Sequence, residues 1–229
     1  MNRVRTGIEG VDRMTEGGFP EGHLIALVGP FGAGKTTFAL QYIREGLANG
    51  ETCMYLSLEE GEDRLIKTAL NYGWDLKEHI GNEELTILKV EASDITNSMS
   101  HLESSFPVTI RSIGASRVVI DPFTLFEMLF EDEAKRRKNV FDLCDVISDT
   151  GATVLITSEV NEDMKGSRYG LIEYIVDGVI LLHRTSDDYG RVRHSIQVEK
   201  MRWSNHSNEI KPYEVTKDGF KVYIKSKVY

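Results

Sequence analysis

Residues 29–36 read GPFGAGKT and lie between the apolar run HLIALV and the helix-like segment TFALQYIREGLANG. The spacing matches G-x-x-x-x-G-K-[ST], in which a strand leads into a glycine-rich loop and the loop leads into a helix. Gly29, Gly32 and Gly34 permit backbone conformations that other residues avoid, so successive N–H groups can turn inward onto phosphate oxygens. A helix that begins here adds the positive end of its dipole. We therefore expect the chain to fold around a phosphate-binding loop.

The residues at the end of this loop supply a charge and a metal ligand. Lys35 carries a mobile positive charge for β and γ phosphates, and Thr36 can offer its hydroxyl oxygen to Mg²⁺. The predicted ATP-binding residues of the loop are Gly29, Gly32, Ala33, Gly34, Lys35, Thr36 and Thr37. A glycine-rich turn before an ordinary helix is the alternative, and the strand-like and helix-like flanks argue against it.

Short apolar runs alternate with helical segments along most of the chain. Strands are expected at His23–Gly29, Thr52–Leu58, Leu85–Val90, Arg117–Asp121, Thr153–Ser158 and Gly178–Arg184. Helices are expected at Lys35–Ala48, Asp63–Tyr72, Thr96–Gly114 and Glu133–Thr150. Runs such as VLIT and GVILL are apolar throughout, which is typical of parallel strands covered by helices on both faces. The pattern predicts an α/β fold with a central, mainly parallel sheet flanked by helices.

The pattern changes after Arg184. The segments HSIQVEK, KPYEV and FKVYI read as short alternating strands, and Asp218–Gly219 marks a hairpin turn between the last two. These strands predict an antiparallel edge on the parallel core. Because no internal repeat or low-complexity linker divides the chain, we expect residues 1–229 to form one domain.

Composition argues against several classes of protein. A net charge of −9 over 229 residues does not suit a surface that coats nucleic acid throughout, because such surfaces need clustered Lys and Arg. The two cysteines, Cys53 and Cys144, show neither a disulfide framework nor the spacing of zinc ligands. No stretch reaches the roughly 18 apolar residues of a membrane span, and the N-terminal segment MNRVRTGIEGVD lacks the apolar core of a signal peptide. We expect a cytoplasmic protein with no membrane partner.

Hydrolysis requires more than a phosphate-binding loop, because a metal-holding acid and a water-activating residue must also be present. Asp121 ends the buried-type run RVVID, which places it beside the loop at the carboxyl edge of the sheet; a cap before Pro122 is the alternative. Glu59 and Glu60 follow the run CMYLSL, and one of them could reach an attacking water. They could equally begin the acidic first turn of the next helix. The two residues by themselves do not decide between these interpretations.

Several separated motifs occur together in one order. They are Thr6-Gly-Ile-Glu-Gly-Val-Asp12, Gly17-Gly-Phe-Pro-Glu-Gly22, the GPFGAGKT loop, the Glu59–Glu60 pair, Tyr72-Gly-Trp-Asp-Leu76, and Glu199-Lys-Met-Arg202 followed by Ser204 and His206. This combination resembles the KaiC-type domains of the RecA-like ATPases and covers nearly the whole chain. Within that group the chain resembles the single-domain archaeal KaiC-like proteins, which are described as paralogues of the recombinase RadA.

The resemblance implies a RecA-like P-loop fold with ATP and Mg²⁺ bound at the subunit interfaces of a ring, usually a hexamer. It implies that Glu59 and Glu60 form the catalytic pair, with Glu59 as the base, acting together with Lys35 and Asp121. The neighbouring subunit would contact ATP through Lys200, Met201, Arg202, Ser204, His206 and, more weakly, Thr216. Asn71 and Ser158 join the predicted ATP-binding set.

Without the resemblance, these positions have ordinary interpretations. Lys200 and Arg202 alternate on a strand, so both could point at a γ-phosphate across an interface, or they could protect an exposed edge strand with charge. Ser158 could sense phosphate through its hydroxyl or could end a capped strand. His206 would by itself be an ordinary surface histidine, and Trp203 is expected to be a packing residue.

The chain also differs from two members of that superfamily. The clock protein has two fused domains, and RadA has an N-terminal helix-hairpin-helix domain that this sequence lacks, so we expect neither the oscillator acting alone nor autonomous strand exchange. Loops that face the pore of RecA-like rings would correspond to residues 131–139, with the run KRRK, and 161–170, with Lys165, Arg168 and Tyr169. A basic strip beside an aromatic ring suits single-stranded DNA. The run EDEAKRRK is equally typical of a solvated helix with acid-base pairs.

Two functions from different classes therefore remain. The first is an ATPase whose ring uses hydrolysis to change its state. The second is a nucleotide-gated binding module with little turnover, which acts through single-stranded DNA or through a recombinase or signalling partner. The presence of Glu59, Glu60, Asp121, Lys200 and Arg202 together favours the ATPase.

Overall fold

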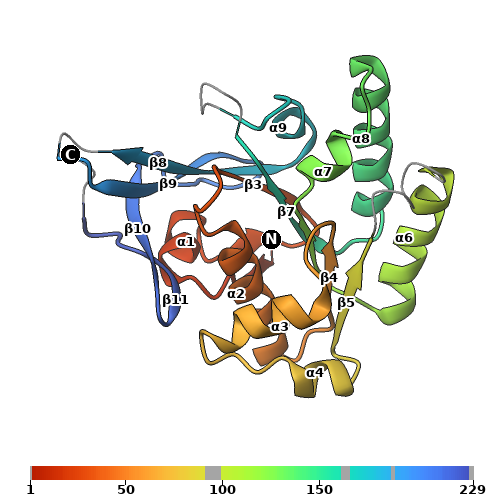
Figure 1. Ribbon diagram of the computed structural model, residues 1–229, viewed down its shortest axis with the longest axis horizontal. Coiled ribbons are helices and arrows are strands. Elements are labelled where there is room, and N and C mark those ends of the chain that lie inside the picture. Colours follow the sequence, from red (N-terminus) through yellow and green to blue (C-terminus); the bar gives the residue numbers. More distant parts are fainter. Residues whose placement is uncertain (1, 91–98, 161–165, 187–188, 227–229) are drawn as a thin grey trace.

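The computed structural model describes residues 2–90, 99–160, 166–186 and 189–226. Within them, nine strands form one sheet in the order β11-β10-β9-β8-β3-β7-β6-β4-β5, and two short strands form a separate pair (Figure 1). The strands are β1 (Arg3–Val4), β2 (Phe19–Pro20), β3 (Leu24–Val28), β4 (Cys53–Ser57), β5 (Leu85–Lys89), β6 (Arg117–Asp121), β7 (Thr153–Ser158), β8 (Gly178–Ser186), β9 (Val192–Met201), β10 (Lys211–Thr216) and β11 (Gly219–Val222). The helices are α1 (Glu9–Met14), α2 (Lys35–Ala48), α3 (Glu62–Leu70), α4 (Lys77–Gly81), α6 (Met99–Ile113), α7 (Thr124–Glu127), α8 (Glu133–Ser148) and α9 (Ile172–Ile175).

Strands β8, β3, β7, β6, β4 and β5 run parallel to one another. Successive residues of a strand point to opposite faces, and both faces of the central strands are buried. In β3, Ile25 and Leu27 pack into the core that contains α1, α2 and α3, whereas Leu24, Ala26 and Val28 pack into the core on the side of α6 and α8. Figure 1 shows these helices on the two sides of the sheet. The parallel sheet is thus the middle layer of three.

Strands β9, β10 and β11 complete the sheet beyond β8, each antiparallel to the strand before it. Strands β8 and β9 form a long pair, and β10 and β11 form a tight hairpin. This hairpin folds back over α1 and α2, and its residues Tyr213, Phe220 and Val222 belong to the core on that side (Figure 1). The antiparallel edge therefore encloses the helix that follows the glycine-rich loop.

The predicted fold class is confirmed. The six expected strands of the parallel core all form, and they differ from the prediction by no more than two residues at an end. Helices α2 and α8 begin where they are predicted to begin, while α3 ends at Leu70 rather than Tyr72. The expected start of the third helix, at Thr96, lies outside the described residues, and the helix is described from Met99. The short elements α1, α4, α7, α9, β1 and β2 have no counterpart in the prediction, because their periodicity is too brief to detect.

Within the described part of the chain, no helix is long and apolar enough to cross a lipid bilayer.

Candidate functional site

The glycine-rich loop leaves β3 and enters α2 with a left-handed backbone at two of its glycines. Gly32 has φ +72° and Gly34 has φ +87°, values that favour glycine over residues with a side chain. Gly29 is different, because its backbone does not have a positive φ. A Cβ atom on Gly29 would lie 2.8 Å from Cβ of Leu182 on β8. The expectation that all three glycines serve backbone freedom is therefore wrong for Gly29, which is required by the close approach of β8.

Lys35 begins α2 and curls back over the loop. Its Nζ donates to the backbone carbonyl oxygens of Gly29 at 2.8 Å and Pro30 at 3.1 Å. Burial lowers the pKa of Lys35, and the negative charges of Asp121, Glu159 and Glu59 act in the opposite direction. The ammonium group of Lys35 thus lies near carboxylates at the carboxyl edge of the sheet.

Asp121 lies next to Thr36, as predicted. The Thr36 hydroxyl donates to Oδ2 of Asp121 at 3.0 Å, the Tyr55 hydroxyl donates to the same oxygen at 2.5 Å, and the Thr157 hydroxyl donates to Oδ1. Burial and the nearby Asp121 charge raise the pKa of Tyr55 well above its usual value, so this phenol remains a donor. The residue before α7 is Phe123, and the cap of that helix uses no side chain. Asp121 is therefore not the cap of α7, and its role in holding a metal stays a prediction.

Glu59 and Glu60 lie between β4 and α3, outside the helix. The acidic residues in the first turn of α3 are Glu62 and Asp63 instead, so the helix-start interpretation of the pair is wrong. Glu60 forms an ion pair with Arg64, 3.2 Å between Oε1 and Nε, while its Oε2 is buried with no hydrogen-bond partner among the described residues. Glu59 is exposed, and its charge acts on Lys35. Of the two, Glu59 is therefore the one whose carboxylate acts on the loop rather than on α3.

Ser158 ends β7 and is fully buried. Its hydroxyl lies 3.1 Å from the hydroxyl of Thr124 on α7, whose oxygen also accepts from the backbone N–H of Glu159 at 2.8 Å. The Ser158 hydroxyl is thus part of a hydrogen-bond network at the end of β7. The preceding residue, Thr157, donates to Asp121, so the structure agrees with both interpretations of Ser158.

The segment that starts at Asn71 approaches the first turn of α2. Asn71 is exposed at the end of α3, and the next residue, Tyr72, places its hydroxyl 3.0 Å from that of Thr37. The ring of Tyr72 stacks on Trp74 with 4.8 Å between centroids. Tyr55, Thr157 and Tyr72 were not among the predicted site residues, because their hydroxyls reach the site only through strand order and loop packing.

Of the predicted neighbour-subunit residues, Lys200, Met201 and Arg202 lie at the opposite end of the sheet from the loop. Lys200 pairs with Val179 and Met201 with Gly178, and Gly178 is level with Ile25 near the start of β3. The loop begins after Val28, the last residue of β3, which is about three residues and roughly 10 Å along the strand from Ile25. Lys200 and Arg202 therefore lie away from the loop of their own chain, and their contact with a neighbouring subunit's nucleotide stays a prediction.

Within the chain these residues are held by local contacts. Nζ of Lys200 donates to the backbone oxygens of Glu173 at 3.0 Å and Val176 at 2.6 Å, and burial lowers its pKa. Arg202 pairs with Asp177 at 3.2 Å. Met201 is only 4% exposed, so its side chain belongs to the core. The predicted contact between Met201 and ATP would therefore be made by its backbone.

The segment after Arg202 extends the same end of the molecule. The Ser204 hydroxyl accepts from Nη1 of Arg3 at 3.0 Å and donates to Glu16 at 3.2 Å, and Nδ1 of His206 lies 3.2 Å from the backbone oxygen of Ser207. Trp203 is 76% exposed, with φ +56°. Its ring meets the ring of His23 edge-on with 5.1 Å between centroids, so the prediction of a packing residue is met by this contact, although most of the side chain is exposed.

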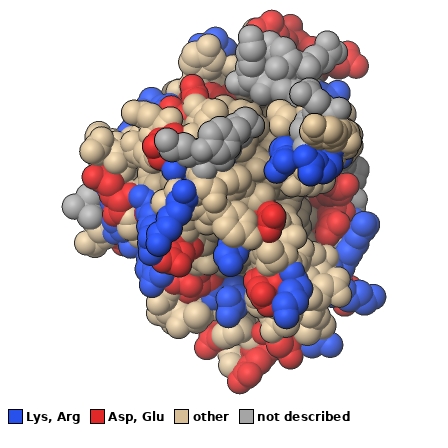
Figure 2. All heavy atoms as spheres, turned by 90° about the vertical axis from the view of Figure 1, so that its left-hand side faces the viewer, with Lys and Arg blue, Asp and Glu red and all other residues tan. Residues whose placement is uncertain are grey.

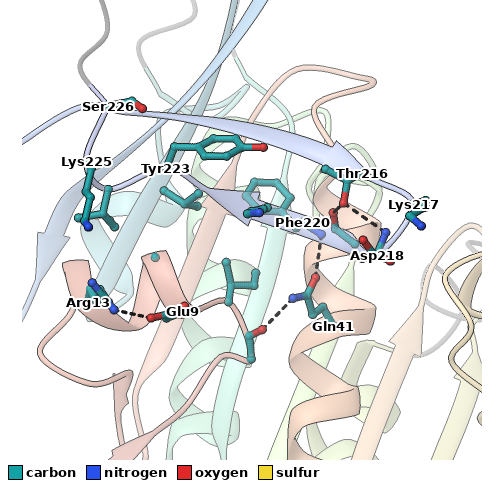
Figure 3. Close-up of a pocket in the computed structure, with 17 residues that line it drawn as sticks. Glu9, Arg13, Gln41, Thr216, Lys217, Asp218, Phe220, Tyr223, Lys225 and Ser226 are labelled. Atoms are coloured by element: carbon teal, nitrogen blue, oxygen red, sulfur yellow. Dashed lines mark hydrogen bonds and ion pairs between the residues drawn. The ribbon is translucent and has the colours of Figure 1, made fainter.

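Thr216 lies elsewhere, on the β10–β11 hairpin. Its hydroxyl donates to the backbone oxygen of Gly219 at 3.1 Å, and the adjacent Val215 approaches Gly34 of the loop. Thr216 lines a cavity of about 610 Å³ between α1 and the hairpin, whose floor is tied together by Gln41 (Figure 3). The structure thus separates Thr216 from Lys200 and Arg202 within one chain.

The two predicted DNA-facing loops meet only in part. Residues 133–139 form the first turns of α8 rather than a loop, and Lys165 lies outside the described residues. Arg136 stacks over the ring of Tyr169, with 4.0 Å from Cζ to the centroid, and donates to the backbone oxygen of Glu127 at 3.0 Å. Arg168 pairs with Glu159 at 3.5 Å. Figure 2 shows another face of the molecule, the side of β8, β9 and β10 at the left of Figure 1, where Lys and Arg are mixed with Asp and Glu.

A buried strand, a glycine-rich loop, a helix, and a threonine hydroxyl bonded to a strand-end aspartate together define a P-loop nucleotide-binding protein of the RecA type. The chain belongs to the KaiC family, because residues 4–227 match the family described as "ATPase: KaiC".

Comparisons with individual proteins agree with this family. The chain is 32% identical to the UPF0273 protein PH0284 of Pyrococcus horikoshii over 96% of this chain and 94% of that protein. It is 29% identical to the circadian clock oscillator protein KaiC of Prochlorococcus marinus over 97% of this chain but 46% of that protein. The crystal structure of the KaiC-like protein PH0186 of Pyrococcus horikoshii is similar with a TM-score of 0.84 and 32% identity, covering 97% of this chain and 99% of that one.

Proposed function

We propose that this chain is a single KaiC-like domain that binds ATP with Mg²⁺ at the glycine-rich loop and hydrolyses it slowly at the interfaces of a ring. The observation that carries the proposal is the hydrogen bond between Thr36 and Asp121 beneath Lys35. A hydroxyl and a carboxylate oxygen 3.0 Å apart, next to a loop that can hold phosphates, form the donor set of a P-loop metal site.

The donor set fits Mg²⁺, which prefers hard oxygen ligands and takes few of them from the protein. Thr36 and Asp121 would hold the ion, Asp121 through a water, and the ion would neutralise charge on the β and γ phosphates. Among the described residues, no group of three or more His, Cys, Asp and Glu side chains could hold a metal on its own. The phosphates of the nucleotide would therefore complete the coordination.

Glu59 is proposed as the base that orients the attacking water. Its carboxylate is exposed near Lys35, whereas Glu60 is held by Arg64 and half-buried. Glu60 would then support the local geometry rather than meet the water directly. Glu59→Gln should lower phosphate release at least 100-fold with nucleotide binding unchanged, because general-base catalysis contributes roughly that factor or more.

The test compares Glu59→Gln with Glu60→Gln, following phosphate release, nucleotide affinity and assembly state in parallel. Glu60→Gln should reduce turnover by a smaller factor. If both variants hydrolyse ATP at the rate of the unmodified protein while binding it normally, the assigned catalytic roles are wrong. If the unmodified protein and both variants bind ATP but none of the three hydrolyses it, a binding module without hydrolysis is favoured.

The position of Lys200 and Arg202 supports the proposed ring. Lys200 and Arg202 lie at the end of the sheet opposite the loop, so head-to-tail contact would bring them to the next subunit's nucleotide. A cation supplied in this way can raise the rate by roughly 10³ to 10⁵. We propose a hexamer on the resemblance to KaiC-type domains, and the mass of the assembly with and without Mg-ATP tests the subunit number.

The alternative is a nucleotide-gated binding module with little turnover, which acts in the cytoplasm through single-stranded DNA or a recombinase or signalling partner. Arg136 above Tyr169 is the observation that favours a nucleic-acid contact, because it joins a cation and an aromatic ring at one place. Arg136 is engaged with backbone oxygens, which argues against it. Salt-dependent retention of oligo(dT), lost in Tyr169→Ala, would support this alternative.

A further inference from the structure

The carboxylate of Asp121 is held by hydroxyl groups from three different elements. Tyr55 of β4 and Thr36 of α2 both donate to Oδ2, at 2.5 Å and 3.0 Å, and Thr157 of β7 donates to Oδ1. Strands β4 and β7 flank β6 on its two sides, so the sheet itself brings Tyr55 and Thr157 to the aspartate. Each oxygen of an ionised carboxylate accepts about two hydrogen bonds, so Oδ2 has no capacity left.

The three hydroxyls have different freedom. Thr36 is partly exposed at the loop and is the hydroxyl that would meet a metal ion. Thr157 fixes the other oxygen. Tyr55 is fully buried in the core beneath α2, so water cannot replace its hydroxyl if that hydroxyl is lost. Tyr55 is therefore the donor that fixes the orientation of the Asp121 carboxylate, with Oδ2 directed toward Thr36.

The bond from Tyr55 is suited to that task. Charge-assisted O–H···O⁻ bonds are short and roughly twice as strong as neutral ones, and the 2.5 Å distance is in that range. The phenol is carried on β4, a strand that is paired with β5 on one side and with β6 on the other. A rigid donor of this kind holds a ligand in place before the metal arrives, which reduces the cost of ordering the site on binding.

We propose that Tyr55 is a positioning residue of the metal site, holding Asp121 so that its carboxylate and the Thr36 hydroxyl are presented together to Mg²⁺. The inference rests on the proposed function, because it requires a Mg-nucleotide at this loop. Loss of the hydroxyl frees Oδ2 to rotate, so more Mg²⁺ is needed to order the site. The grip of the loop on phosphate without metal is unaffected, because it uses backbone N–H groups and Lys35.

The test is Tyr55→Phe, with Tyr42→Phe as the matched control. Tyr42 is also fully buried, and its hydroxyl donates to the backbone oxygen of Thr153 at 3.2 Å, away from Asp121. Affinity for a fluorescent ATP analogue is measured in EDTA and across a Mg²⁺ titration, and Mn²⁺ binding is followed by paramagnetic resonance. Tyr55→Phe should need roughly 10-fold more Mg²⁺ or above for half-maximal effect, because removing an outer-shell partner typically costs about 10- to 100-fold in metal affinity. Its affinity in EDTA should be unchanged, and Tyr42→Phe should match the unmodified protein.

Two results separate this inference from the proposed function. If nucleotide binding by the unmodified protein does not respond to Mg²⁺, the metal role of Thr36 and Asp121 is wrong. If it responds and Tyr55→Phe gives the same titration as Tyr42→Phe, the positioning role of Tyr55 is wrong. Thr157→Val provides a second variant, since it removes the donor to the other oxygen. An unchanged Mg²⁺ requirement in both Tyr55→Phe and Thr157→Val overturns the idea that these hydroxyls position the carboxylate.

Discussion

Buried ionisable side chains in this protein differ sharply in how well they are paired. Arg117 is fully buried and has partners for its guanidinium, and Asp121 has hydroxyl donors on both oxygens. Glu127, at the end of α7, is also fully buried, yet neither of its carboxylate oxygens has a hydrogen-bond partner in the described part of the chain. Burial raises its pKa to about 8, the negative charge of Glu173 adds to the rise, and Arg136 opposes it. Glu127 is therefore protonated near neutral pH.

The pH dependence of stability should reveal Glu127. Between pH 4.5, its ordinary pKa, and pH 8, its pKa in the folded protein, the folded state keeps a proton that the unfolded chain has lost. Stability must then fall as pH rises through this window and level off above it. This fall should be absent in Glu127→Gln. The free energy of unfolding of the variant, relative to that of the unmodified protein, should therefore rise by roughly 2–4 kcal/mol between pH 5 and pH 8.

Urea unfolding of both proteins at several pH values measures this difference, and the slope with pH is the informative quantity. The amide group that Glu127→Gln introduces is buried as well, so the two proteins can differ by a constant amount. Parallel curves for the two proteins from pH 5 to pH 8 would show that Glu127 is ionised in the folded state.

At the scale of secondary structure elements, Arg117 joins parts of the chain that are distant in sequence. Arg117 is the first residue of β6 and forms a two-point ion pair with Glu51, which precedes β4. Its Nε lies 2.8 Å from Oε2 of Glu51, and its Nη2 lies 2.7 Å from Oε1. Its Nη1 donates to the backbone oxygens of Arg5 and Tyr42, and its guanidinium lies over the ring of Tyr42. One side chain therefore ties β6 to α2 and to the N-terminal segment. Sequence patterning identified Arg117 only as the first residue of a strand.

Breaking this link should destabilise the fold more than breaking a surface pair. Glu51→Gln leaves the buried guanidinium of Arg117 without its counter-charge, and we expect a loss of roughly 2–4 kcal/mol in the free energy of unfolding. Glu9→Gln is the matched control, because Glu9 and Arg13 form an exposed pair whose loss should cost less than about 1 kcal/mol. Chemical denaturation of both variants measures the two losses. Equal losses would mean that the buried pair contributes no more than a surface pair.

At the scale of the whole molecule, the loop and the predicted neighbour-subunit residues lie at opposite ends of one sheet. Lys35 is at the carboxyl end of β3, and Lys200 and Arg202 are at the level where β3 begins. If Lys200 and Arg202 contribute to the nucleotide site, as we propose, a closed head-to-tail ring would bring them to the site of the next copy. This geometry is the physical basis for the proposed oligomer.

Complementation tests this proposal. Lys35→Ala and Arg202→Ala proteins should each be inactive alone. When equal amounts are mixed and allowed to reassemble, about a quarter of the interfaces should pair an intact loop with an intact Arg202, because each half is drawn at random around a heterologous ring. ATP hydrolysis by the mixture should then reach up to about one quarter of the unmodified rate. Full activity of Arg202→Ala alone, or no recovery in the mixture, would contradict a shared site.

Much of the fold was predictable from sequence because its signals are local. An apolar run, a glycine-rich loop and an amphipathic helix specify strand, loop and helix within about 25 residues, and Asp121 was identifiable as a carboxylate after a buried strand. Packing details were less accessible. Gly29 is needed for the approach of β8, and Met201 faces the core while Trp203 faces outward. These outcomes depend on which strands become neighbours.

The sequence alone determined that this chain is a parallel α/β protein with a phosphate-binding loop and a strand-end aspartate, since each of these features is encoded within one element and its flanks. Only the tertiary structure decided that Tyr55 and Thr157 meet at Asp121, and that Lys200 and Arg202 lie beyond reach of their own loop. The first result comes from the strand order β7-β6-β4, and the second comes from the pairing of β9 with β8 beside β3. Strand order depends on how the whole core packs, so it cannot be predicted from short-range periodicity in the sequence.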